Sequence, residues 1–106
     1  MKKKVLFVIL LLVGCSKKKT LFENILPKNS NVYFSNDIVE REGFNILENE
    51  FVYNGGGLGI GDFNNDGLQD LYFTGNMVDN SLYLNKGDFK FVDVSKIAHI
   101  RAENRW

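Results

Sequence analysis

From residue 51 onward, the chain consists of short apolar runs separated by glycine, asparagine and aspartate. This spacing is typical of a β-meander, in which short strands alternate with tight turns. Glycine and asparagine suit such turns because they adopt positive φ angles at low cost. The predicted fold class is therefore all-β, a single antiparallel four-stranded sheet with strands at Leu58–Asp62, Asp70–Thr74, Ser81–Asn85 and Phe89–Asp93.

The two central predicted strands carry bulky side chains at consecutive positions, as Leu71-Tyr72-Phe73 and Leu82-Tyr83-Leu84. Successive side chains of a strand point to opposite faces, so both faces of this sheet need cover. A β-propeller blade or a stacked repeat receives that cover from a neighbour on each side. The pattern predicts an incomplete piece of a larger repeat architecture, to which further repeats or a partner protein supply the missing contacts.

The sequence before the sheet has weaker patterning. Residues 21–50 form a lead-in segment of mixed character, whose best strand candidate is Asn31–Ser35. Residues 51–95 form the predicted blade, and residues 96–106 begin a connection to a next repeat. Helical patterning is weak in this part of the chain, and only Val94–His99 is expected to form a short helical turn.

The N-terminus has the form of a secretory signal, with three lysines, the apolar run Val5–Val13 and a small residue before Cys15. The apolar run is about half the length of a bilayer-spanning helix. Leu12-Val13-Gly14-Cys15 resembles a bacterial lipobox, which implies a signal peptide at 1–14, diacylglycerol on Cys15 and a lipidated tether at 15–20. We expect an extracytoplasmic, membrane-anchored bacterial lipoprotein, on the outer membrane or the periplasmic face. An ordinary secretory signal is the alternative.

Composition narrows the possible functions. The chain has 106 residues, with 13 basic and 13 acidic side chains, and so lacks the basic excess of a nucleic-acid binder. Removal of the signal would take three lysines with it and leave the product mildly acidic, which suits cation binding. A single cysteine excludes an intramolecular disulfide. A chain of this length has a small core, and it shows no catalytic constellation, so we predict no enzyme activity.

The most informative local pattern is Asp62-Phe63-Asn64-Asn65-Asp66-Gly67-Leu68-Gln69-Asp70. Calcium prefers six to eight oxygen ligands, which a tight loop presents when oxygen-bearing side chains occupy alternate positions. The candidate ligands are the side chains of Asp62, Asn64, Asp66 and Asp70 and the Leu68 carbonyl. An EF-hand requires glutamate at the twelfth position, where this chain has Phe73. A metal-free turn is the alternative, because asparagine and aspartate also favour turns.

These residues carry a family resemblance. The run Tyr53–Asn76, continued by Ser81–Gly87 and Phe89–Phe91, resembles an FG-GAP or VCBS-type repeat over roughly Phe44 to Trp106. More narrowly, it resembles bacterial lipoproteins related to cartilage acidic protein, which often carry an ASPIC/UnbV region. The resemblance implies one blade of an integrin-α-like β-propeller with calcium in the turn. By that resemblance the same four side chains and the Leu68 carbonyl are the calcium ligands, and Trp106 opens a next repeat.

Three functional hypotheses remain open at this point. The first is a calcium-binding, lipid-anchored binding or scaffold module whose ligand is unknown. The second is the N-terminal piece of a secreted polysaccharide-active enzyme, whose catalytic part lies beyond Trp106. The third is a truncated product without independent function. Gly55-Gly56-Gly57 is not followed by the lysine and helix of a phosphate-binding loop, so we interpret it as crowded backbone.

Overall fold

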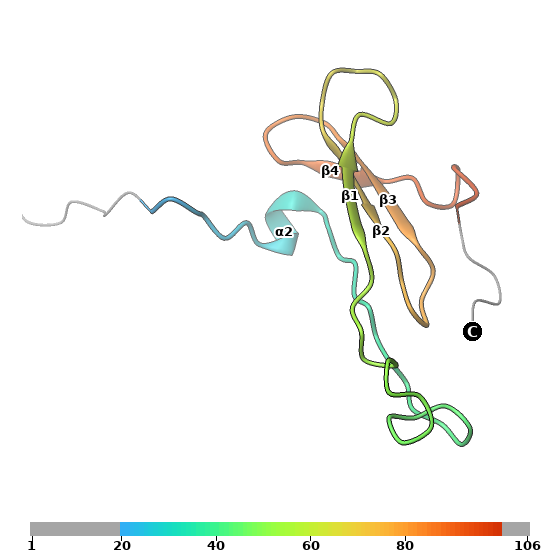
Figure 1. The fold of residues 1–106 in the computed structure, drawn as a ribbon. Coiled ribbons are helices and arrows are strands. Elements are labelled where there is room, and N and C mark those ends of the chain that lie inside the picture. The colour runs from blue at the N-terminus through green and yellow to red at the C-terminus, as the bar shows by residue number, and fades with distance from the viewer. Residues whose placement is uncertain (1–19, 101–106) are drawn as a thin grey trace, which may run out of the picture.

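The computed structural model describes residues 20–100, and its main feature is one small sheet. The four strands lie in the order β1-β2-β3-β4, and every neighbouring pair is antiparallel (Figure 1). This confirms the predicted all-β fold class, and the sheet is open and not closed on itself. The elements are α2 (Pro27–Ser30), β1 (Leu58–Gly61), β2 (Asp70–Phe73), β3 (Ser81–Asn85) and β4 (Phe91–Asp93).

The strand register assigns the side chains to two faces. Leu71 pairs with Ile60 on one side and with Tyr83 on the other, and Tyr83 pairs with Asp93. Paired residues share a face, so these side chains lie together with Phe73 on what we name the lead-in face. The second face carries the alternate positions of the same strands, among them Tyr72, Leu82, Leu84 and Val92.

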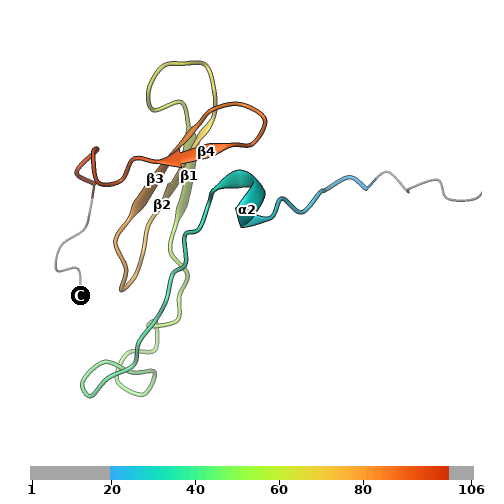
Figure 2. The ribbon, with the colours of Figure 1, turned by 180° about the vertical axis from the view of Figure 1, so that it is seen from behind.

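An extended stretch of the lead-in segment covers part of the lead-in face (Figures 1 and 2). The Phe34 ring stacks on Phe73 with centroids 4.8 Å apart, and Phe73 meets Tyr83 edge to face at 5.8 Å. Tyr83 is consequently only 4% exposed, and its burial is the main cause that raises the pKa of its hydroxyl. These aromatic contacts form the centre of the small core.

Both faces nevertheless keep large apolar side chains in contact with solvent. On the lead-in face Leu58 and Ile60 of the edge strand β1 are 56% and 63% exposed. On the second face Val92 is 47% exposed, and the neighbouring Phe63 is 53% exposed. The open edges and exposed apolar groups agree with a single repeat unit that lacks neighbours.

The predicted strand at Asn31–Ser35 is wrong. Residues 31–39 form no ladder with the sheet, and Asn31 lies in the left-handed region with φ 63° as the C-cap of α2. Phe34 of this stretch packs on the sheet through its stack on Phe73, without adding a fifth strand. The short helix α2 was not predicted, although proline at its first position is a common helix start.

Strand ends differ slightly from prediction. β4 begins at Phe91 and not at Phe89, because Asp88 and Phe89 have positive φ angles of 49° and 54° and belong to the turn. The predicted helical turn near Val94–His99 is present, since the Ala98 N–H donates to the Val94 carbonyl at 2.9 Å.

Several expectations fall wholly or partly outside the described residues. These are the signal peptide at 1–14, lipidation of Cys15, most of the tether at 15–20, and the last six residues of the connection at 96–106. Between residues 20 and 100, no helix has the length and apolar character needed to cross a membrane.

Candidate functional site

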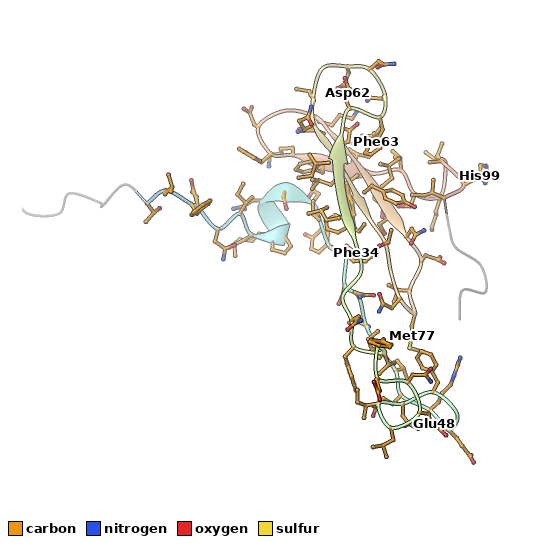
Figure 3. The ribbon with its side chains drawn as sticks, viewed as in Figure 1. Phe34, Glu48, Asp62, Phe63, Met77 and His99 are labelled. Carbon is orange, nitrogen blue, oxygen red and sulfur yellow. The ribbon has the colours of Figure 1, made fainter. Side chains whose placement is uncertain are left out.

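The predicted calcium turn is the connection between β1 and β2. It extends beyond one end of the sheet, with Asp62 in the loop and Phe63 near its base (Figure 3). Asp62 directly follows β1, and Asp70 is the first residue of β2. The antiparallel pairing of these strands brings the two ends of the loop together, because Gly61 pairs with Asp70.

The loop winds around the carboxylate of Asp62. Asp62 Oδ2 accepts a hydrogen bond from the Gly67 N–H at 2.8 Å, and Oδ1 accepts one from the Asp66 N–H at 3.1 Å. Gly67 has φ +85°, a conformation that glycine adopts without strain. The sequence folds this way because an aspartate side chain can replace backbone acceptors in a tight turn.

Asn64 and Asp66 form the second part of the loop. Asn64 Oδ1 accepts the Asp66 N–H at 3.1 Å, and Asn64 Nδ2 donates to Asp66 Oδ2 at 2.8 Å. Asp66 Oδ1 accepts the Leu68 N–H at 2.9 Å. The Leu68 N–H, followed by the Asn64 amide, holds the pKa of the Asp66 carboxyl below its usual value, because both donors stabilise the charged form. The carboxylate is therefore ionised at neutral pH.

Asp70 has a different environment. Its side chain is fully buried, and its two oxygens accept hydrogen bonds from two backbone amides. Oδ2 accepts the Phe63 N–H at 2.9 Å and Oδ1 accepts the Asn85 N–H at 2.8 Å. Asp70 thus connects the β1–β2 loop to the end of β3. Sequence reasoning identified Asp70 only as a metal ligand and missed this structural role, which depends on a register that the sequence does not reveal.

The donor chemistry of the loop suits a hard cation. Carboxylate and amide oxygens are the ligands that calcium prefers, and each oxygen has two lone pairs, so one accepted N–H leaves a lone pair for an ion. The structure links Asp62, Asn64, Asp66 and Leu68 in one hydrogen-bonded loop and holds Asp70 at the sheet by separate contacts. Among residues 20–100, no group of three or more Asp, Glu, His or Cys side chains is placed to hold a metal ion. Any ion in this loop would therefore depend on amide and carbonyl oxygens as well.

Outside the loop, Glu40 is an acidic residue with structural partners of its own. Glu40 Oε1 accepts the Ile46 N–H at 3.3 Å, and the same side chain bonds to Tyr53, which raises the pKa of the Tyr53 hydroxyl. Glu48 and His99 lie away from the predicted calcium turn, in different loops (Figure 3). Within the described part of the chain these groups assemble no second candidate site.

Part of the chain is similar to a known repeat family. Residues 62–106 match a family model described as an FG-GAP-like repeat. The match begins at Asp62 and contains β2, β3 and β4, so the sheet is consistent with a single blade of this repeat type. Repeats of this kind suggest an extracellular repeat or binding module. The comparisons with curated proteins and with solved structures gave no match.

Proposed function

We propose that this chain is a calcium-stabilised, extracytoplasmic binding or scaffold module anchored to a bacterial membrane by lipid on Cys15. The observation that supports the calcium part is the loop from Asp62 to Asp70, whose oxygen-bearing side chains alternate along a tight turn within an FG-GAP-like repeat. The narrower relationship to ASPIC/UnbV-associated lipoproteins belongs to the same proposal, and its basis is the sequence resemblance alone.

The residues that would hold calcium are Asp62, Asn64 and Asp66 through their side chains and Leu68 through its carbonyl. Bound calcium would neutralise the negative charge of this loop, which lowers repulsion between its carboxylates. Asp70 would contribute either as a ligand or as the buried acceptor that fixes the loop at Phe63. Calcium binding is expected to make the β1–β2 connection more rigid and to raise the stability of the blade.

Isothermal titration calorimetry of the full chain in detergent tests the metal site. We expect saturable calcium binding with a Kd on the order of 10⁻⁴ to 10⁻³ M, the range of extracellular calcium modules. The double variant Asp62→Asn/Asp66→Asn should lose this binding. Asp88→Asn is the matched control, because Asp88 is an exposed aspartate in the β3–β4 turn and should leave calcium affinity unchanged. A folded parent chain that releases no heat and shows no calcium-dependent stabilisation would refute the calcium proposal.

Metabolic labelling tests the anchor independently. Labelled palmitate should enter the wild-type chain in a bacterial host and should not enter Cys15→Ser. Equal labelling of the two chains would contradict lipid attachment at Cys15. Because this experiment reports on the N-terminus and calorimetry reports on the loop, either half of the proposal can fail without the other.

A further inference from the structure

A cavity of about 470 Å³ lies at the end of the sheet opposite the calcium turn. One wall is the loop that contains Phe44, Asn49 and Phe51, and the other is the β2–β3 turn that contains Asn76. Glu48 and Met77 mark this region in Figure 3. The volume falls within the usual range of small-molecule sites.

The cavity is lined by uncharged groups. Its walls combine two aromatic rings, Phe44 and Phe51, with several asparagine side chains and the backbone of Gly55, Gly56 and Gly57, and no titratable side chain lines it. An asparagine amide both donates and accepts hydrogen bonds. Within residues 20–100, the backbone N–H and C=O groups of Gly55 and Gly56 form no hydrogen bonds, so they are available to a ligand.

The walls are held by specific contacts and are not loose loops. The Asn76 N–H donates to Asn36 Oδ1 at 2.8 Å, and Asn76 Nδ2 donates to the Asn54 carbonyl. Asn80 is 3% exposed, and its side chain joins the Gly75 N–H at 3.1 Å to the Tyr72 hydroxyl at 3.1 Å. These bonds fix the β2–β3 turn against the opposite wall.

The cavity lining requires glycine at position 56 but not at position 55. A Cβ atom on Gly56 would lie 1.8 Å from the Thr74 carbonyl oxygen, so the backbones approach too closely for any side chain. The crowded backbone expected at Gly55-Gly56-Gly57 is therefore present at Gly56. At Gly55 a Cβ atom would meet nothing within 4 Å, and its φ is not in the left-handed region. A side chain at Gly55 would enter open space without strain.

From this lining we infer that the cavity is a binding site for a neutral carbohydrate. The side-chain amides of Asn49 and Asn54 and the free backbone groups suit the alternating donors and acceptors of sugar hydroxyls, and an aromatic ring provides an apolar surface for the C–H face of a sugar. An anion would find no basic side chain in the lining. A cation would find no carboxylate in the lining.

This inference rests on one part of the proposed function, that the chain is a binding module. It does not require calcium. The cavity and the β1–β2 loop lie at opposite ends of the sheet, so their ligands can be titrated separately. Calcium calorimetry reports on the loop, whereas sugar binding measured in EDTA reports on the cavity alone.

The test is saturation-transfer NMR with titration of the full chain in EDTA. The probes are neutral trisaccharides of glucose, mannose and N-acetylglucosamine, with trigalacturonate and inorganic phosphate as anionic probes. We expect saturable binding of at least one neutral trisaccharide. Gly55→Val, which adds a branched side chain at a lining position, and Phe51→Ala, which removes an aromatic ring from the lining, should each weaken binding about tenfold or more, or about 1.4 kcal/mol.

Phe22→Ala is the matched control for Phe51→Ala. Phe22 and Phe51 are 84% and 74% exposed, so neither change should alter the urea midpoint, but only Phe51 lines the cavity. Three results would overturn the inference: no saturable binding of any neutral trisaccharide by the folded chain, neutral binding that Gly55→Val and Phe51→Ala leave unchanged, or tighter binding of phosphate or trigalacturonate.

Discussion

The buried carboxylate of Asp70 offers the sharpest test of how this fold is held together. It accepts one N–H from Phe63 and one from Asn85, at 2.9 and 2.8 Å, and no part of it is exposed. A hydrogen bond to a charged group contributes about 1.5–3 kcal/mol, so removal of both bonds in Asp70→Ala should cost about 3–6 kcal/mol. That loss is comparable to the whole stability of a small domain. Asp70→Ala is therefore expected to be largely unfolded without denaturant.

Asp70→Asn is the variant that should remain folded enough to measure. It keeps one acceptor oxygen but turns an amide donor toward the other N–H, so it should lose about half of that free energy, or about 1.5–3 kcal/mol. With a urea m-value of about 1 kcal/mol/M for a small protein, the unfolding midpoint should fall by about 1.5–3 M. Asp88→Asn makes the same chemical change at an exposed turn residue and should leave the midpoint nearly unchanged.

The measurement is made in EDTA and again in calcium, because this comparison separates two roles for Asp70. If the side chain acts through its two backbone amides, the fall in midpoint persists in EDTA. If it acts only as a metal ligand, the variant matches the parent in EDTA and differs from it only in calcium. An unchanged midpoint in EDTA would refute the structural role assigned to Asp70.

Two further predictions concern the lead-in segment and the loop. Phe34→Ala removes the ring stacked on Phe73 and should lower the free energy of unfolding, measured by urea denaturation, by about 1–3 kcal/mol. Phe22→Ala, at an exposed position, should leave it unchanged. Equal urea midpoints for Phe34→Ala and the parent chain would contradict the role of the stack. The ionised Asp66 carboxylate accepts hydrogen bonds in the folded loop, which lower its pKa below the ordinary value of about 3.8 expected in the unfolded chain. Its contribution to the stability of the loop should therefore be fully present above about pH 3.8 and should be lost as pH falls through the lower folded pKa. NMR titration of the Asp66 carboxyl measures this shift, and a midpoint at or above the ordinary aspartate value would contradict it.

The sequence predicted the strands of the meander well because turn residues limit each of them. Ser81–Asn85 was predicted with the correct ends, and β1 and β2 each stop one residue earlier than expected. Asn31–Ser35 has a similar apolar pattern but no strand partner. A strand requires a neighbouring edge, and local patterning does not show whether that edge is available.

The candidate site was predicted only in part, for a similar reason. The alternation of Asp62, Asn64 and Asp66 identifies a tight loop, and the hydrogen bonds within it span at most five residues. The partners of Asp70 lie 7 and 15 residues away in the chain, and the second depends on how β3 is aligned with β2. Likewise, the cavity combines segments that are separated in sequence, and no motif indicates it.

The placement of the lead-in segment has a consequence for the order of folding. Each strand pairs with the next one along the chain, so the sheet can form hairpin by hairpin through short loops that close quickly. The lead-in segment joins this sheet through residues 40 positions apart, at Asn36 and Asn76, and 61 positions apart, at Asn29 and Lys90. These contacts require the sheet to exist first. The part of the chain that is synthesised earliest is therefore expected to be among the last to acquire its final contacts.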